Sequence, residues 1–315
     1  MPRTIEHPQK SCCKHASGMQ HRAIIRPDGQ AGVDEEIRFT IATLVNDGAH
    51  YEKMRASFKA GGFDTPSCEY LYIDNTGPEQ TCAYRGLNAM LNAARGRHVI
   101  LCHQDVRLLT DTRDTLAARL SALDDADPHW ALAGNAGGVS PGALALRITD
   151  PHGADQRVGR FPARVMSLDE NFIVVRRDAR VGFSADLSGF HFYGADICLN
   201  ADIMGYNAYV IDFHLVHLSA GNKNNAFDEM EARFRSKWSR ALSPRWMQTT
   251  CSLLRLSGDT LGQLTGRLAE APFRKLSRHL PTAAGWTRPD ASKIDAATPD
   301  AVAIAHATTA AETTG

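Results

Sequence analysis

Acidic and amide side chains follow three short apolar runs in the first third of the sequence. They are Asn46-Asp47, Asp74-Asn75 and His103-Gln104-Asp105. A carboxylate such as Asp105 can hold a divalent cation, and the cation can neutralise a diphosphate. These residue types therefore indicate a metal-assisted phosphate site.

The phosphate-binding loops of other nucleotide-binding proteins are missing from the sequence. No G-x-G-x-x-G follows the first apolar run, and no G-x-x-x-x-G-K-[ST] occurs. A Rossmann-like methyltransferase with Asp74 on a ribose would need the missing Gly-rich loop, which argues against it. Any phosphate must be bound by other means, and a cation is the simplest.

An α/β fold is needed to position these residues. The β-branched, apolar pattern predicts strands over 38–45, 69–73 and 98–102. Apolar residues at helical spacing follow the first two strands. The first of these helices is expected to end at Gly61-Gly62, and the second at Gly96 as its C-terminal cap. We expect a mostly parallel central sheet flanked by helices, with ligands bound outside the carboxyl ends of the strands.

The composition excludes several classes of protein. The 315 residues hold 35 Lys and Arg against 35 Asp and Glu, so bulk binding of a polyanion such as nucleic acid is not expected. Seven cysteines without a C-x-x-C pair argue against a secreted disulfide scaffold. The group Cys12, Cys13, His15 and His21 lacks the second ligand pair of a zinc finger and is interpreted as part of a polar tail.

The residues from Arg85 to Asp105 resemble the core of GT-A fold glycosyltransferases of the family-2-like type. Asn88, Ala94, Gly96 and the 103/105 pair stand at the family's spacing, with His103 where its first Asp usually stands. The His-Gln-Asp-Val form is similar to a bacterial subgroup that includes proteins of antibiotic-sugar and polysaccharide gene clusters. The resemblance covers roughly 38 to 240, with a second strong block over 190–199.

The resemblance implies a metal site. It makes Asp105 and His217 the protein ligands of Mn²⁺ or Mg²⁺ between the two donor phosphates. The role of His103 stays open between orienting the site and a structural position, and Gln104 is expected near the donor. For Asp105 the plain alternative is a solvated turn.

The resemblance also implies a nucleotide site along the strand ends. Asp74 and Asn75 are expected at the base, and Asn46 and Asp47 beside base or ribose; ordinary Asx turns are the alternative for all four. Asn88 is expected to support the base-binding loop. Arg85, one helical step away, is either near phosphate or simply exposed.

For catalysis the resemblance singles out Asp196. It is expected to begin a helix and to take the proton from the acceptor hydroxyl. Asp169, Glu170 and His191 are candidates for binding the acceptor, with solvated or structural positions as the alternative.

Together these residues predict a metal-dependent inverting glycosyltransferase. It would move a sugar from a nucleoside diphosphate donor to a glycan, lipid-linked or small-molecule acceptor. The alternative is a sugar-nucleotide-binding protein without turnover, because each acidic pair of the family is reduced to one carboxylate. The donor sugar, acceptor and oligomeric state stay open.

The expected organisation has four parts. Disordered tails are predicted over 1–35 and 281–315, a GT-A domain over 36–220, and a basic helical segment over 221–280. That segment holds eleven Lys and Arg against five Asp and Glu, interleaved with apolar residues. It is either a solvated helix packed on the core or an amphipathic contact with anionic lipid. We expect a cytoplasmic protein, since no apolar stretch reaches membrane-span length, and keep open a position at the inner face of the membrane.

Overall fold

The computed structural model describes residues 22–27, 36–221, 225–250 and 252–277. Both predicted tails fall largely outside these residues, as do Cys12, Cys13, His15 and His21. The chain divides into two compact units, Met1–Trp238 and Ser239–Gly315. Among the described residues, no helix has the length and apolar content needed to cross a membrane.

An eight-stranded sheet forms the centre of the first unit. In spatial order its strands are β1 (Ile24–Ile25), β3 (Cys68–Asp74), β2 (Phe39–Val45), β4 (His98–Cys102), β12 (Phe172–Arg176), β6 (Trp130–Gly134), β13 (Asn207–Val210) and β10 (Ala163–Val165). β3, β2, β4, β6 and β13 run in one direction, while β12 lies antiparallel between β4 and β6. The predicted α/β class, with a central sheet flanked by helices, is confirmed.

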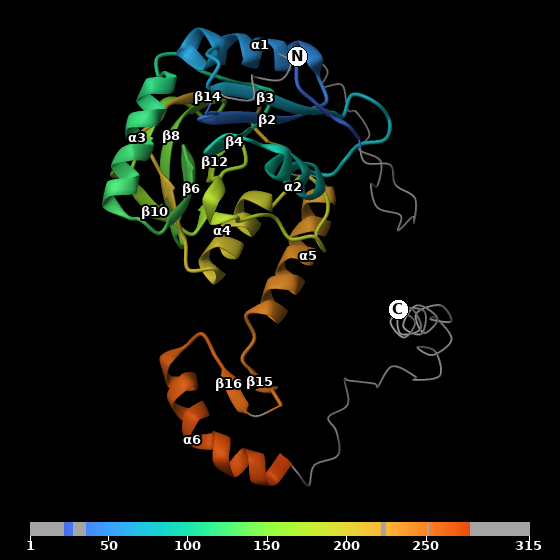
Figure 1. The fold of residues 1–315 in the computed structure, drawn as a ribbon, viewed down its shortest axis with the longest axis vertical. Helices are drawn as coiled ribbons and strands as arrows, with labels where there is room; N and C mark the ends of the chain where they lie inside the picture. The colour runs from blue at the N-terminus through green and yellow to red at the C-terminus, as the bar shows by residue number, and fades with distance from the viewer. Residues whose placement is uncertain (1–21, 28–35, 222–224, 251, 278–315) are drawn as a thin grey trace, which may run out of the picture. The chain divides into compact units, whose positions relative to one another are not determined.

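Helices cover both faces of this sheet (Figure 1). One face carries α1 (Gly48–Phe58) and α3 (Arg113–Ala126), and the other carries α2 (Ala83–Ala93) and α4 (Tyr193–Ile203). Strands covered on both faces read as continuous apolar runs, and all five residues of β4 and of β6 are buried. Short turns of π-helix (Lys59–Phe63) and 3₁₀-helix (Arg177–Ala179) complete the connections.

Gly96 does not have its predicted role as a helix cap. The C-cap of α2 is Ala94, and a Cβ at position 96 would lie 2.5 Å from the backbone nitrogen of Thr40. The glycine is therefore required because the chain enters β4 directly against β2. Its own N–H donates to the Thr40 hydroxyl at 2.9 Å.

A second sheet adjoins the first and was not predicted. Its order is β11 (Ser167–Leu168), β7 (Ala136–Ser140), β8 (Ala143–Asp150), β14 (Leu215–His217) and β5 (Val106–Arg107), with β9 (Gly153–Val158) on β8. The apolar run through residues 210–216 is split between the two sheets, because β13 ends at Val210 and β14 begins at Leu215. Asp212, in the gap, pairs with Arg157 and Arg147.

Two boundaries of the predicted organisation are wrong. Within the expected N-terminal tail, β1 pairs antiparallel with β3, and Arg26 donates to the Ala93 carbonyl at 2.9 Å. β1 thereby covers an edge of the sheet that would otherwise be open. At the other end, α5 (Asn225–Ala241) continues the first unit as far as Trp238.

The contacts of α5 explain its place in the first unit. Met230 and Trp238 are buried, and Phe234 stacks on Phe192 with 5.4 Å between ring centroids. Residues four apart share one helix face, so Met230, Phe234 and Trp238 form a single apolar stripe against the core. The domain therefore extends beyond the predicted limit at residue 220.

The sequence had suggested that the second unit is helical throughout. Its described part instead contains a pair of strands as well as a helix. β15 (Arg245–Gln248) and β16 (Leu253–Leu256) form an antiparallel hairpin, followed by α6 (Thr260–Ser277). Trp246 of the hairpin stacks on Phe273 of α6, with ring centroids 4.5 Å apart. This aromatic pair joins the helix to the hairpin.

Candidate functional site

Three side chains that can ligate a metal converge at the carboxyl end of β4. His103 Nδ1 lies 3.3 Å from His217 Nε2, and Asp105 Oδ1 lies 3.5 Å from His217 Nε2 and 3.9 Å from His103 Nδ1. Around a metal with bonds of about 2.1 Å, neighbouring ligand atoms are about 3.0 Å apart in the octahedral shell of Mg²⁺ or Mn²⁺ and about 3.4 Å apart in a tetrahedral shell. The three atoms therefore fit one divalent cation.

Strand pairing positions two of these ligands. β5 begins immediately after Asp105 and pairs antiparallel with β14, so that Val106 faces His217. The N–H of Leu218 also donates to the Asp105 carbonyl at 3.1 Å. The ladder thus holds His217 beside Asp105, although the two are far apart in sequence.

Tyr193 orients the third ligand. Its hydroxyl donates to the Glu170 carbonyl at 3.1 Å and lies 2.7 Å from His103 Nε2. Because the hydroxyl proton points at a carbonyl, which can only accept, the His103 Nε2–H must be the donor in the second contact. His103 Nδ1 then carries the free lone pair and faces Asp105 and His217.

Electrostatics at Asp105 and His103 suit a cation, whereas His217 must lose a proton before it can bind one. Burial alone would raise the pKa of Asp105, but hydrogen bonding from His217 and the nearby imidazoles lower it well below its usual range. Burial lowers the pKa of His103, an effect to which the adjacent His217 adds. Burial works against a charge on His217, yet its hydrogen bond to Asp105 raises the pKa of that imidazole. An ionised carboxylate and a neutral imidazole are the forms that bind metal.

Gln104 links the carboxyl end of β4 to the carboxyl end of β2. Its Oε1 accepts from the N–H groups of Asn46 and Asp47 at 2.9 and 3.0 Å, and its amide donates to Asn46 Oδ1. Asp47 also caps α1 by accepting from the N–H of His50 at 3.0 Å. The predicted donor-binding residues at these two strand ends are thus brought together, in part through turn and cap chemistry.

Asp74 and Asn75 shape the end of the neighbouring strand. Asp74 accepts from the N–H and hydroxyl of Thr76, and these bonds lower the pKa of its carboxyl. Asn75 is buried, and its side chain exchanges two hydrogen bonds with the Thr81 backbone. Asp74 therefore offers an ionised carboxylate at the sheet edge, whereas Asn75 holds the loop.

Asn88 has a different role from the predicted one, and Arg85 is exposed. The Asn88 side chain exchanges two 2.9 Å hydrogen bonds with the Phe183 backbone. It therefore fixes the segment before α4 rather than the loop at the base site. Arg85 lies on the exposed side of α2.

The three predicted acceptor residues lie around the metal-ligand group. β12 pairs with β4, and the His103 N–H donates to the Asn171 carbonyl at 3.0 Å, which brings Asp169 and Glu170 to this end of the sheet. The Asp169 carboxylate is exposed, and its charge raises the pKa of His217. Burial lowers the pKa of His191. The His191 imidazole lies close enough to His103 to contribute to the lowering of the His103 pKa, after burial and His217.

Asp196, the predicted catalytic base, lies in the protein core. The residue is fully buried within the first turn of α4 rather than at its start, since the helix begins at Tyr193. Its two oxygens accept from the N–H and hydroxyl of Ser184, from the Trp238 indole and from the Asn200 amide, at 2.7 to 3.2 Å. With both oxygens occupied and no exposure, the carboxylate joins α4 to α5, and this position argues against a role as the base.

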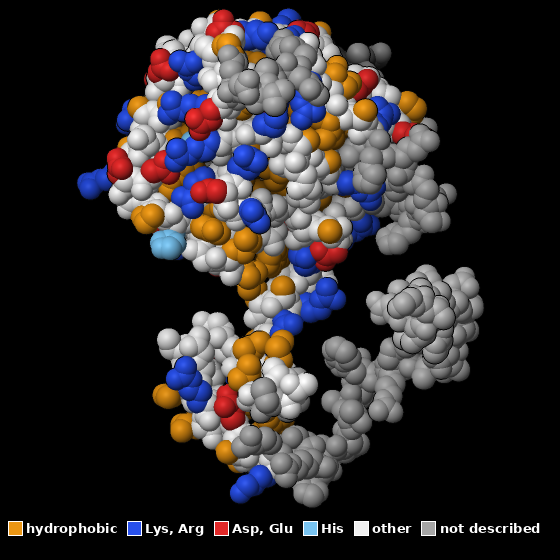
Figure 2. Space-filling model, in the orientation of Figure 1, with side chains coloured by type: hydrophobic (Ala, Val, Ile, Leu, Met, Phe, Trp, Pro, Cys, Tyr) orange, Lys and Arg blue, Asp and Glu red, His pale blue; other side chains and the backbone are white. Residues whose placement is uncertain are grey.

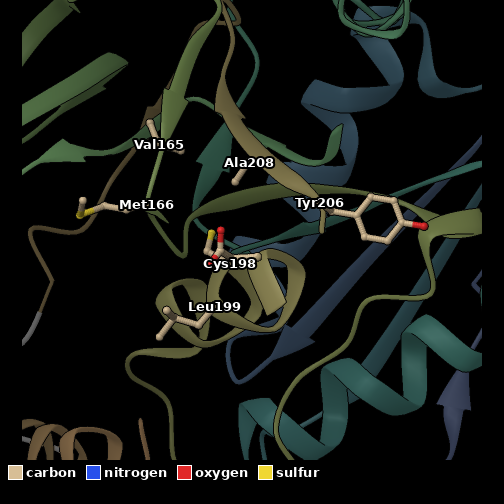
Figure 3. Close-up of a pocket in the computed structure, with 7 residues that line it drawn as sticks. Val165, Met166, Cys198, Leu199, Tyr206 and Ala208 are labelled. Atoms are coloured by element: carbon tan, nitrogen blue, oxygen red, sulfur yellow. The ribbon is translucent and has the colours of Figure 1, made fainter. Parts of the chain in front are cut away.

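A small hollow lies elsewhere, between α4, β10 and β13 (Figure 3). Its volume is about 140 Å³, and its lining includes Val165, Cys198 and Tyr206. Ligand pockets usually measure about 300 to 1,000 Å³. The hollow is too small for a sugar nucleotide and contains none of the predicted site residues.

Sequence reasoning missed several residues of the site and its support. His103 was left open, and Tyr193, Ser184 and Trp238 were not considered. The His-x-Asp spacing at the end of a strand was the available signal for His103. Nothing in the sequence linked the other three to residues so distant along the chain.

Comparison with known proteins identifies a relative at substantial sequence identity. No protein-family profile matches the sequence. A protein of Fuscovulum blasticum named ATP synthase subunits region ORF 6 is 38% identical over 231 residues, which cover 71% of this chain and 93% of that protein.

The chain is also similar to solved structures at low identity. The mannosyltransferase PcManGT from Pyrobaculum calidifontis, in complex with GDP-Man and Mn²⁺, is 16% identical over 66% of this chain and 65% of its own, with a TM-score of 0.44. GalNAc-T7 with UDP, GalNAc and Mn²⁺ is 8% identical over 59% of this chain and 44% of its own, with a TM-score of 0.41. S. aureus TarS with UDP-GlcNAc is 11% identical over 61% of this chain and 61% of its own, with a TM-score of 0.37. The chain thus spans less than two thirds of each solved chain. All three scores are below 0.5, and these likenesses do not bear on the activity of this chain.

Proposed function

This chain belongs to the family of the Fuscovulum blasticum protein ATP synthase subunits region ORF 6, and we propose that it transfers a sugar from a nucleoside diphosphate to an acceptor hydroxyl. The proposal includes a GT-A form of the α/β fold and a bound Mn²⁺ or Mg²⁺. One observation carries it: His103, Asp105 and His217 converge at the sheet edge where the predicted donor-binding residues also lie. The resemblance of residues 85–105 to glycosyltransferases supports the same function.

The protein groups have distinct tasks in this proposal. Asp105, His103 and His217 would hold the cation, which when bound would neutralise the diphosphate and ease its departure. Asp74 presents an ionised acceptor for the donor's base or ribose. Gln104 holds the carboxyl ends of β2 and β4 in a fixed relation, which pre-orients the donor.

Asp169 replaces Asp196 as the proposed base. Its carboxylate is exposed, and only Oδ1 is engaged, by the N–H and amide of Asn171. Its charge acts on both His103 and His217, as expected for a group beside the reacting phosphate and sugar. One base and no opposed nucleophile suit direct displacement with inversion.

The first experiment tests the metal-assisted donor site. Asp105→Ala should lower the Mn²⁺-dependent affinity for UDP and GDP by more than about tenfold, since even an outer-shell change at a metal ligand causes that loss. Calorimetry with each nucleotide, with and without Mn²⁺, measures it. Asp125→Ala, which removes an exposed carboxylate on α3, is the matched control and should bind as the wild type does. Unchanged affinity in a folded Asp105→Ala variant would refute the site.

Binding without turnover is a second candidate, and the enclosure of Asp196 favours it because the predicted base is unavailable. A panel of nucleotide sugars with Mn²⁺, read as release of nucleoside diphosphate, separates the two. Under the transferase proposal, Asp169→Asn slows release about 10²- to 10⁴-fold and preserves nucleotide affinity. Tight metal and nucleotide binding without release from any donor would establish the alternative.

A further inference from the structure

α6 carries an apolar face that no described residue covers. Leu261, Leu264, Leu268 and Leu276 are 58 to 73% exposed. Their spacings of three, four and eight residues place them along one side of the helix. Several exposed leucines along one side of a single helix are unusual on a soluble surface and indicate an interaction site.

The opposite side of α6 is already used. A Cβ at Gly266 would lie 2.5 Å from the Arg255 side chain of β16, and Phe273 stacks on Trp246 of β15. Small and aromatic residues therefore face the hairpin. The leucines are left on the side that needs another partner.

The second unit is also basic. Residues 239–277 hold six Lys and Arg against two Asp and Glu. On α6 itself, Arg267 and Lys275 are exposed and directly precede Leu268 and Leu276. Figure 2 shows hydrophobic and basic side chains together on the visible face of this unit.

We propose that α6 lies in the surface of an anionic lipid bilayer, with its leucines among the acyl chains and Arg267 and Lys275 at the headgroup phosphates. An amphipathic helix with leucines on one face and cations beside them is the kind that binds in the interface without crossing it. α6 does not qualify as a membrane span. This inference does not depend on the proposed transferase activity.

Charge favours lipid over a second copy of the chain. Two copies joined through this face would bring basic surfaces together, and like charges disfavour such a contact. Phosphatidylglycerol or phosphatidylserine headgroups supply the opposite sign. Anionic lipid therefore satisfies both the apolar row and the cations.

The test is sedimentation of the full chain with vesicles of phosphatidylcholine and phosphatidylglycerol at low salt. The wild type should sediment with these vesicles, less with pure phosphatidylcholine, and less at high salt because of screening. Leu264→Gln/Leu268→Gln should lower the partition coefficient at least about tenfold, since two apolar side chains are lost from the lipid. Leu109→Gln/Leu144→Gln changes two leucines of similar exposure in the first unit and should bind like the wild type.

A second variant tests the electrostatic part without altering the apolar row. Arg267→Glu/Lys275→Glu should weaken binding to anionic vesicles and leave binding to neutral vesicles nearly unchanged. The altered side chains are exposed, so all variants should melt with the wild type. Wild-type protein that ignores anionic vesicles at low salt would overturn the proposal. So would a leucine variant that binds lipid normally but turns a dimer into a monomer in gel filtration.

Discussion

His103 shows how one hydrogen bond can decide what a residue offers to a ligand. An imidazole has two nitrogens, and in the neutral ring only one carries a proton. The Tyr193 oxygen accepts a hydrogen bond from the His103 Nε2–H, because the hydroxyl donates its own proton to the Glu170 carbonyl. The ring is thereby fixed with Nδ1 as the lone-pair donor beside Asp105 and His217.

Tyr193→Phe should therefore weaken metal binding although Tyr193 is not a ligand. Without the hydroxyl, His103 can rotate or change tautomer, and losses of about 10- to 100-fold are usual when such a partner is removed. Calorimetric titration with Mn²⁺ alone measures the effect. Tyr84→Phe removes another part-buried hydroxyl, which donates to the His191 carbonyl, and should leave Mn²⁺ affinity unchanged. An equal loss in both variants would point to general loosening instead.

Asp196→Asn should now act on stability rather than chemistry. An amide in place of one oxygen turns a donor toward groups that are themselves donors, at a cost of about 1 to 3 kcal/mol. For a domain of this size the melting temperature should fall by roughly 2 to 10 °C, and Mn²⁺-dependent nucleotide affinity should persist. Asp202→Asn, on the exposed side of the same helix, is the control. Normal melting with lost turnover would restore Asp196 as the base.

The residues of the site could be predicted only where the local sequence carries the signal. Asp105 follows a short apolar run at a motif spacing, and His217 follows the last strand of the resemblance. Asp196 also matched a motif, but its burial depends on Ser184 and Trp238, which reach it from other elements. A residue's type and spacing do not reveal which partners have already taken its oxygens.

At the scale of elements, runs with one consistent pattern were predicted closely. The strand predicted over 98–102 is β4, and those over 38–45 and 69–73 differ from β2 and β3 by a residue or two. The antiparallel insertion of β12 and the second sheet were not predicted. Their strands are short and pair with strands that are distant in sequence, so the local pattern of apolar residues does not reveal which strands pair with which.

α5 provides a test of the domain boundary. In a chain ending at residue 241, the first unit should melt at nearly the same temperature as in the full protein, because Met230, Phe234 and Trp238 keep their contacts. A chain ending at residue 220 loses all three, and burial of each large apolar side chain contributes about 1.5 to 3 kcal/mol. Circular dichroism should show its melting lowered by more than about 5 °C. Equal melting of the two chains would place α5 outside the domain.

At the scale of the whole molecule, Glu170 gives the stability a pH dependence. Burial raises the pKa of its carboxyl from the ordinary 4.5 to about 8. Between those values the folded state keeps a proton that the unfolded chain has released. Stability from this group is therefore complete below about pH 4.5 and is lost as the pH rises toward 8.

Glu170→Gln, which mimics the protonated side chain, should remove that loss. The melting temperature of the variant minus that of the wild type should increase steadily from pH 5 to pH 8. Glu79→Gln, at an exposed position, should show a constant difference over the same range. A constant difference for Glu170→Gln as well would mean that Glu170 ionises normally in the folded protein.

The pairing of β5 with β14 also determines when a newly made chain can complete the group of His103, Asp105 and His217. His217 leaves the ribosome 112 residues after Asp105, an interval on the order of 10 s at ordinary rates of translation. Until then His103 and Asp105 lack their third partner, and β14 must also find β8 before it can settle. Under the proposed function, loading with Mn²⁺ or Mg²⁺ would therefore follow synthesis of the chain through His217, because a nascent chain stalled before Leu215 would hold only two of the three proposed ligands.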